Sequence, residues 1–172
     1  TPDGELKPVC AGMRSPSGLG ANAEGDMFYT DQQGNWVATN SLHHMRAGAF
    51  FHHVEALASM DQPGSTIHGV DKVPGGLPLP EALKQFPQLR PPAVWFPYKK
   101  MGQSATDIVL DESGGKFGPF DGQLFVGEFT QAGTNRVFLE KVNGEYQGAC
   151  FPFRLGFASA VLRLVQGKDG SL

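Results

Sequence analysis

Short apolar runs that follow glycine turns repeat along the chain. Asp121-Gly122 is a tight-turn pair, and the apolar run at residues 124–126 is bounded by glycines, which predicts a strand leaving a hairpin. Residues 24–31 have the same order of acidic-glycine turn, apolar run and acid. The turn returns at residues 168–172, where the sequence stops before the expected strand. Three copies of one turn-strand unit predict a repeat architecture.

A basic residue stands at the head of a second apolar stretch before each turn. These residues are Arg14, Lys100 and Arg154. The second and third copies are about 54 residues apart and the first two about 86, whereas propeller blades repeat every 40 to 50 or so residues. An insertion of about 30 to 40 residues therefore separates the first pair. The sequence predicts an all-β fold of about three to four β-propeller blades with one long loop and helix insertion.

Residues 1–172 are thus predicted to be one partial β-propeller domain, with its insertion at about residues 54–92. Proline and glycine are frequent in the insertion, and only residues 80–86 have a helical pattern. Asn143-Gly144 predicts a two-residue hairpin turn. We expect strands at residues 5–13, 27–30, 36–40, 94–98, 105–110, 123–129, 136–142, 146–153 and 158–165. Because open sheet edges need cover, we expect the remaining blades or another copy to complete the ring.

The composition narrows the function without naming it. The 172 residues are 40% hydrophobic and 18% charged, with a net charge of −3, as in an ordinary globular protein. This charge gives no reason to expect nucleic acid as a partner. No apolar run approaches the roughly 18 residues that span a bilayer, so no transmembrane segment is expected. Cys10 and Cys150 are predicted to be free, buried thiols.

The three basic residues are the first candidate site. If Arg14, Lys100 and Arg154 occupy equivalent repeat positions, they converge near the central channel of the propeller. Such a cluster suits a polyanionic ligand, since arginine forms bidentate contacts with carboxylates. The alternative is that each cation pairs with an acid of its own blade, such as Asp31, Asp107 or Glu128.

Acids and histidines offer two further kinds of chemistry. Asp31 stands at a predicted strand end beside the glycine-rich loop at Gly34, and carboxylates with backbone carbonyls are ligands for Ca²⁺. The chain has no contiguous calcium-loop motif. Its five histidines could include a general base, or they could lie at the surface or pack. Adjacent histidines on a strand point to opposite faces, so at most one of each pair enters a given site. The histidines are His43, His44, His52, His53 and His68.

Several segments resemble known quinoproteins. The sequence R-S-P-S-G-L from Arg14, followed by G-D-M-F-Y-T-D at residues 25–31, resembles a signature of the soluble quinoprotein glucose and sorbosone dehydrogenase superfamily. Residues 95–104, 114–128 and 136–154 are similar to the propeller module of secreted "membrane-bound dehydrogenase-like" proteins of planctomycete-type bacteria. Those modules are often fused to c-type cytochrome domains.

The resemblance implies a six-bladed ring that binds pyrroloquinoline quinone (PQQ) and Ca²⁺ and oxidises the hydroxyl of a small sugar or alcohol. Arg14 matches the arginine that contacts the quinone, and Lys100 and Arg154 would bind its carboxylates too. Asp31 and Gly34 match the acid-and-glycine loop that holds calcium. A c-type cytochrome domain is an implied partner, and the implied location is secreted or periplasmic. No catalytic residue is assigned.

Two other functions remain open at this point. A non-catalytic module could bind carbohydrate or a protein on an aromatic platform, because aromatic rings present large contact areas. The platform residues would be Trp36, Trp95, Tyr98 and Phe120. Alternatively, the module is structural and positions an electron-transfer domain.

Overall fold

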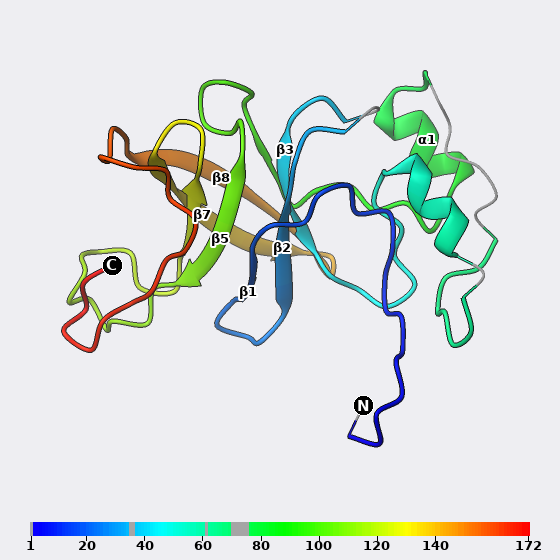
Figure 1. The fold of residues 1–172 in the computed structure, drawn as a ribbon, viewed down its shortest axis with the longest axis horizontal. Coiled ribbons are helices and arrows are strands. Elements are labelled where there is room, and N and C mark those ends of the chain that lie inside the picture. The colour runs from blue at the N-terminus through cyan, green and yellow to red at the C-terminus, as the bar shows by residue number, and fades with distance from the viewer. Residues whose placement is uncertain (1, 35–36, 61, 70–75) are drawn as a thin grey trace.

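Two four-stranded antiparallel sheets form the body of the protein (Figure 1). The structure is a computed structural model that describes residues 2–34, 37–60, 62–69 and 76–172. The first sheet contains β1 (Leu19–Ala21), β2 (Met27–Asp31), β3 (Asn40–His44) and β4 (Val94–Phe96). The second contains β5 (Ala105–Leu110), β6 (Leu124–Glu128), β7 (Gly133–Val142) and β8 (Glu145–Arg154). In both sheets the strands follow chain order, as in propeller blades.

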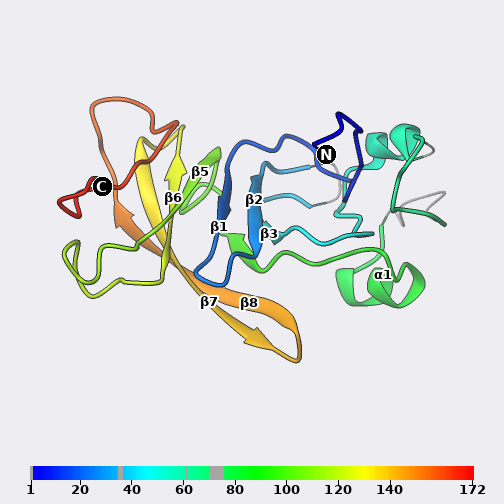
Figure 2. The ribbon, with the colours of Figure 1, turned by 90° about the horizontal axis from the view of Figure 1, so that it is seen from below.

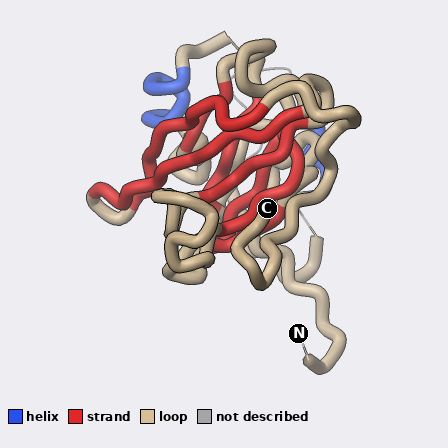
Figure 3. Tube along the Cα trace, turned by 90° about the vertical axis from the view of Figure 1, so that its left-hand side faces the viewer, coloured by secondary structure: helices blue, strands red, loops and turns tan. Residues whose placement is uncertain are grey.

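One apolar core lies between the two sheets. Phe28, Leu42 and Phe96 contribute from the first sheet, and Leu124 and Val126 from the second. These side chains alternate with residues that point to the opposite face of each sheet, such as Tyr29 and Phe125, which are buried there as well. Figure 3 shows the strands gathered in one body, with the helices outside it.

The sheets approach each other closely where β1 meets β5. A Cβ atom added at Gly18 would lie 2.0 Å from the backbone oxygen of Thr106, and one at Gly20 would lie 2.9 Å from Ile108. Thr30 Oγ1 donates to the same Thr106 oxygen at 2.7 Å. Glycine at position 18 therefore allows direct contact between the backbones of the two sheets.

The insertion between β3 and β4 has its own small core. It contains the 3₁₀ helix η1 (Val54–Ser59) and the helix α1 (Leu79–Gln85), which lie to one side of the sheets in Figure 1. The helix predicted at residues 80–86 is confirmed within one residue, with proline in its first turn. Neither described helix has the length and apolar character to cross a membrane. The buried residues of this core are Phe50, Met60, Ile67, Ala82 and Leu89.

A long hairpin of β7 and β8 extends from the second sheet (Figure 2). Asn143 and Gly144 at its tip have φ angles of 52° and 83°, which confirms the predicted two-residue turn. The hairpin reaches the first sheet, since Cys150 Sγ lies 3.4 Å from the backbone oxygen of Trp95. Cys150 and Cys10 are free thiols, as predicted, but both are half-buried and not fully buried as expected.

The all-β prediction is confirmed, but three strand predictions are corrected. No strand occurs at residues 5–13, and the strand expected at residues 36–40 is found at Asn40–His44. Residues 158–165 form no strand: their backbone groups bond to side chains of β5, since Thr106 Oγ1 donates to the Val161 oxygen and Leu164 N donates to the Asp107 carboxylate. The described residues contain two four-stranded sheets, and the number of blades in the ring stays a prediction.

Candidate functional site

A buried carboxylate at the end of β2 organises the first sheet's loop end. Asp31 is fully buried, and its Oδ1 accepts hydrogen bonds from the backbone N–H of Ser15 at 2.8 Å and of Gln32 at 2.9 Å. Its Oδ2 accepts one from Arg14 N at 3.0 Å and a longer one from the Tyr29 hydroxyl at 3.4 Å. Asp31 therefore ties the turn before β1 to the end of β2.

Two buried histidines lie beside Asp31. His43 is on β3 directly opposite Tyr29 on β2, and the two rings stack with centroids 5.0 Å apart. His52 comes from the segment after β3, where its backbone N–H donates to the Gly12 oxygen at 3.0 Å. The Nε2 atom of His52 lies 3.6 Å from Asp31 Oδ2, and the His43 and His52 ring centroids are 5.3 Å apart.

The ring nitrogens of this pair are mostly without partners. His43 Nε2 lies 2.9 Å from Ser41 Oγ. Among the described residues, neither Nδ1 of His43 nor either nitrogen of His52 has a hydrogen-bond partner. Both side chains are at most 2% exposed. Most buried polar atoms in proteins are hydrogen-bonded, so three orphaned nitrogens in one place need an explanation.

Strand alternation decides which histidine of the first pair joins the site. His43 faces Asp31, whereas His44 faces the other way and stacks on Phe28 at 5.2 Å. The expectation that only one of two adjacent strand histidines enters a site is therefore confirmed for this pair. In the second pair, His52 is buried and His53 is half-buried beside Glu55, with 3.3 Å between nitrogen and oxygen.

Burial keeps both site histidines neutral. Desolvation lowers the pKa of His43 well below its ordinary 6.5, and repulsion from His52 lowers it further. Desolvation also lowers the pKa of His52; the Asp31 charge opposes this effect and His53 adds to it. Burial and then the Asp31 charge raise the pKa of Tyr29, so its hydroxyl keeps its proton. The site thus holds one carboxylate and two neutral imidazoles.

These three residues form a possible metal-binding group. One ligand atom each from Asp31, His43 and His52 lies within 4.8 Å of the other two. Gly34 adjoins the group, since a Cβ atom there would lie 3.3 Å from His52 Nδ1. The structure therefore places the two predicted metal residues, Asp31 and Gly34, in one neighbourhood. The sequence reasoning did not single out His43 and His52, although their two histidine pairs were a visible signal.

Arg14 lies at the same loop end, but its guanidinium group forms no ion pair with Asp31. Its backbone N–H contacts Asp31, while its exposed side chain has no ion pair with another described residue. The alternative in which this cation pairs with an acid of its own blade is therefore wrong for Arg14. Its guanidinium group is left for other partners.

The supposed equivalence of the three cations is also corrected. In the second sheet, Glu128 at the end of β6 accepts from Gln103 N and Ser104 N at 3.0 Å, as Asp31 accepts from Arg14 and Ser15. Gln103 thus occupies the position of Arg14. Lys100 lies three residues earlier in the turn after β4, and Arg154 lies at the end of the outer strand β8. Both are exposed, and their role as quinone ligands stays a prediction.

The aromatic residues proposed as a platform are divided. Trp95 on β4 is 39% exposed and Tyr98, in the turn after it, is 40% exposed. Phe120 belongs to a different cluster, because its ring packs against Phe125 at 5.9 Å and Phe153 at 5.5 Å. Trp36 lies outside the described residues.

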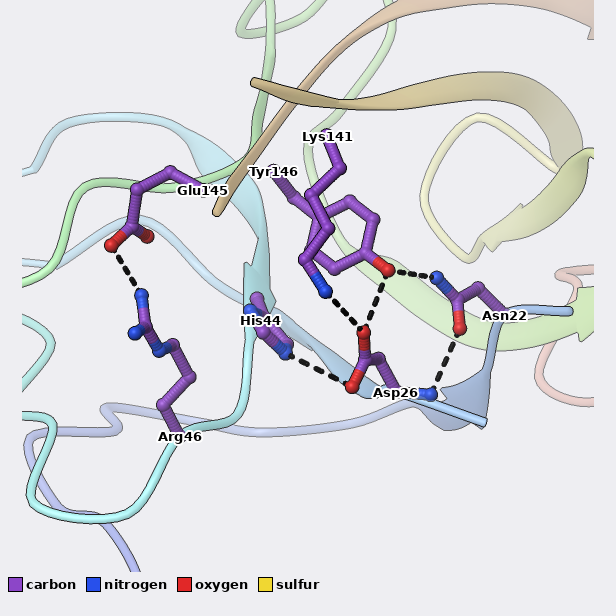
Figure 4. Close-up of polar contacts among 7 residues, drawn as sticks. All are labelled: Asn22, Asp26, His44, Arg46, Lys141, Glu145 and Tyr146. Atoms are coloured by element: carbon purple, nitrogen blue, oxygen red, sulfur yellow. Dashed lines mark hydrogen bonds and ion pairs between the residues drawn. The ribbon is translucent and has the colours of Figure 1, made fainter. Parts of the chain in front are cut away.

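A second polar network joins the two sheets away from Asp31 (Figure 4). Asp26 accepts from the Tyr146 hydroxyl at 2.7 Å and from Lys141 Nζ at 3.1 Å, and His44 Nε2 lies 3.8 Å away. Asn22 Nδ2 donates to the Tyr146 hydroxyl at 2.8 Å. Hydrogen bonds from Tyr146 and then Lys141 lower the pKa of Asp26 below its ordinary 3.8. Tyr146 lines two cavities of about 260 and 240 Å³.

Comparison with known proteins supports the architecture. Neither a family model nor a curated protein matches the sequence. A crystal structure from Thermus thermophilus, described as a candidate oxidoreductase (glucose dehydrogenase), is similar with a TM-score of 0.56 and 17% identity. The match covers 94% of this chain and 38% of that chain. The likeness shows the fold. This chain therefore spans well under half of the protein that it matches.

Proposed function

We propose that the protein oxidises the hydroxyl of a small sugar or alcohol with a quinone cofactor, in a secreted or periplasmic setting. The observation that carries the proposal is the exposed guanidinium of Arg14, which has no ion pair among the described residues. The backbone of Arg14 is held in place by its hydrogen bond to buried Asp31. The fold shared with a candidate glucose dehydrogenase and the sequence resemblance to quinoproteins support it.

The chain has residues that would bind a carboxylate-bearing quinone, but it has no assigned base for the oxidation itself. The Arg14 guanidinium would bind a carboxylate of PQQ with two parallel hydrogen bonds, and Lys100 and Arg154 would add charge. PQQ, when bound, supplies the hydride acceptor. His43 and His52 are neutral bases, but both are buried and cannot touch a substrate in this arrangement. The catalytic base therefore stays unassigned.

Calcium does not fit the residues around Asp31. Ca²⁺ takes about six to eight oxygen ligands. Asp31 would offer a single carboxylate oxygen, and the other possible ligand atoms grouped with it are imidazole nitrogens, not oxygens. We therefore derive no step that uses calcium at Asp31 and Gly34.

The proposed partners follow from the open face of the second sheet. Phe151, Phe153, Leu155 and Phe157 are each between 39% and 47% exposed, and apolar surface of this kind is usually covered by a neighbour. The remaining blades of the ring, or another copy, would cover it. A c-type cytochrome domain would then take electrons from the reduced quinone.

Calorimetric titration of PQQ into the native protein that contains these residues tests the proposal. We expect saturable binding that Arg14→Ala weakens at least tenfold, because one bidentate charged contact is lost. Lys84→Ala, which removes an exposed cation on α1, is the matched control and should bind PQQ normally. Equal affinity in the wild type and Arg14→Ala would remove Arg14 from the proposal, and no PQQ binding at all would reject quinone chemistry.

A non-catalytic binding module is the second candidate, favoured by the exposed rings of Trp95 and Tyr98. Aromatic rings of this exposure can stack on the apolar faces of sugars. This function predicts a change in tryptophan fluorescence on adding a glycan, lost in Trp95→Ala, with no reduction of any quinone. Quinone reduction in the presence of a sugar would exclude it.

A further inference from the structure

We propose that Asp31, His43 and His52 form a buried site for Zn²⁺ or a similar divalent transition metal. The inference does not rest on quinone chemistry: it follows from the donor atoms and their burial alone. It also replaces the calcium expectation at Asp31 with an ion of a different class.

The unpartnered nitrogens are the first argument. His43 and His52 are at most 2% exposed, and three of their four ring nitrogens have no hydrogen-bond partner among the described residues. A water-exposed histidine could satisfy these atoms with solvent, but these rings are covered. A metal ion would satisfy one nitrogen of each ring.

The type and charge of the donors are the second argument. Neutral imidazole and carboxylate are common Zn²⁺ ligands, and sites with two histidines and one carboxylate occur in zinc enzymes. Harder ions such as Ca²⁺ and Mg²⁺ prefer all-oxygen shells. The buried Asp31 carboxylate supplies a negative charge that a divalent cation would offset.

Asp31 keeps one oxygen available for the ion. Its Oδ1 accepts two backbone hydrogen bonds at 2.8 and 2.9 Å, whereas Oδ2 accepts one at 3.0 Å and a long one at 3.4 Å. Oδ2 is also the oxygen nearer to His52 Nε2, at 3.6 Å. A carboxylate oxygen can share its second lone pair with a metal while it holds a backbone N–H.

The His43 ring is held in place from outside the group, as metal-bound histidines usually are. Ser41 Oγ contacts His43 Nε2 at 2.9 Å, and the His43 ring packs against Tyr29 at 5.0 Å and Phe51 at 4.8 Å. Gly34 leaves space beside His52, because any side chain there would lie 3.3 Å from Nδ1.

The ligand atoms of Asp31, His43 and His52 need to move only slightly closer together to bind Zn²⁺. Bonds of about 2.0–2.1 Å place the ligand atoms of a tetrahedral Zn²⁺ about 3.4 Å apart. The three ligand atoms here lie within 4.8 Å of one another. A shift of about 1 Å in the ring positions, within the reach of small χ rotations, closes the shell.

Metal analysis of the native protein is the first test. After removal of adventitious ions by gel filtration, we expect about one equivalent of Zn²⁺ per chain. Chelator-stripped protein should take up Co²⁺, giving visible d–d absorption that Zn²⁺ abolishes and an excess of Ca²⁺ leaves unchanged. Absence of any stoichiometric transition metal, together with failure of the stripped protein to bind Co²⁺, would overturn the proposal.

Variants of the two histidine pairs locate the site. His52→Gln and His43→Gln should each weaken Co²⁺ binding by more than about 100-fold, since loss of even an outer partner of a zinc ligand costs about 10–100-fold. His44→Gln and His53→Gln change the adjacent histidines and should leave affinity unchanged. Equal loss in the control variants would show that the ion binds elsewhere and would overturn the assignment. Circular dichroism verifies folding, and the wild-type Co²⁺ spectrum tests the donor set even if a variant does not fold.

Discussion

The loop ends of the two sheets use one structural device in two chemical settings. Asp31 ends β2 and Glu128 ends β6; both are fully buried, and each accepts backbone hydrogen bonds from the turn before the inner strand of its own sheet. Glu128 is completed by two further backbone donors, Thr130 N at 2.9 Å and Gln131 N at 3.3 Å. The carboxylate clamp is therefore a feature of the repeat, and it says nothing about function by itself.

The difference lies in the neighbouring strand. His43 faces Tyr29 across β2 and β3, whereas Asn135 faces Val126 at the corresponding place across β6 and β7. Asn135 Nδ2 donates to the Met101 oxygen at 2.5 Å. Among the described residues, no group of possible metal ligands includes a histidine at this end of the second sheet. At the first end, His43 of β3 and His52 of the segment after it thus add two imidazoles to the clamp, whereas the second end adds only an amide. The metal site proposed at the first end depends on these additions.

Removing the carboxylate should have the largest effect in either sheet. We expect Glu128→Ala to lower the free energy of unfolding by at least about 3 kcal/mol, because several buried N–H donors lose a charged acceptor. Asp31→Ala should lose a similar amount in metal-free protein. Urea denaturation measures both, with Glu128→Gln as the milder control. A loss under about 1 kcal/mol in Glu128→Ala would show that the clamp is not structural.

The contact between the sheets gives the next effect. Gly18→Ala should cost about 2 to 3 kcal/mol, since its Cβ atom would meet the Thr106 oxygen at 2.0 Å and backbone cannot move aside easily. Leu19→Ala, on the same strand at a side chain that is 58% exposed, is the control and should change stability little. If the two variants unfold at the same urea concentration, the close approach of the sheets is wrong.

Thr106 tests how the segment after β8 is held. Thr106→Val removes the 2.7 Å hydrogen bond to the Val161 oxygen at nearly constant volume, and we expect a loss of about 1 kcal/mol. Thr106→Ser keeps a hydroxyl and should therefore retain most of the free energy of unfolding that the valine variant loses. Hydrogen exchange should show faster exchange at residues 161–166 in the valine variant only; unchanged exchange would mean that this bond does not hold the segment.

The Asp26 network should give the smallest effect, visible only in acid. Its pKa is lower in the folded protein than the ordinary 3.8, so its contribution is present above about pH 4 and is lost as the pH falls through the folded value. Tyr146→Phe removes the hydrogen bond that lowers the pKa of Asp26 most, so the free energy of unfolding should depend less on pH in the acidic range. Denaturation at a series of acidic pH values measures it, and an identical profile in both proteins would contradict the assignment.

Local patterns in the sequence predicted much of the fold. The strand at Ala105–Leu110 was expected at those bounds, and the turn at Asn143-Gly144 needed only the positive φ angles that these two residues tolerate. Residues 158–165 carry an apolar pattern typical of a strand but form none. The pattern specifies which side chains prefer burial, and it does not supply the neighbouring strand.

The site was harder to predict, because its geometry depends on contacts between distant segments. Asp31 and Gly34 were expected together from their closeness in sequence. His52 lies beside Asp31 and Gly34 because two contacts hold its segment there. The backbone of Phe50 forms β-bridges with Ala11 and Leu89, and the His52 N–H donates to the Gly12 oxygen. The three cations failed as equivalents because the repeat is fixed by backbone N–H groups at Arg14 and Gln103, where side-chain charge is not constrained.

X-ray absorption at the metal edge of the native protein tests the central claim most directly, since it reports the ligands of the ion bound at the Asp31 end. We predict a Zn²⁺ shell with two imidazole nitrogens and carboxylate oxygen at about 2.0–2.1 Å, reduced to one imidazole in His52→Gln. A protein free of transition metal, or one whose ion is Ca²⁺ with oxygens at about 2.3–2.6 Å, would contradict the account and leave Asp31 a structural clamp like Glu128.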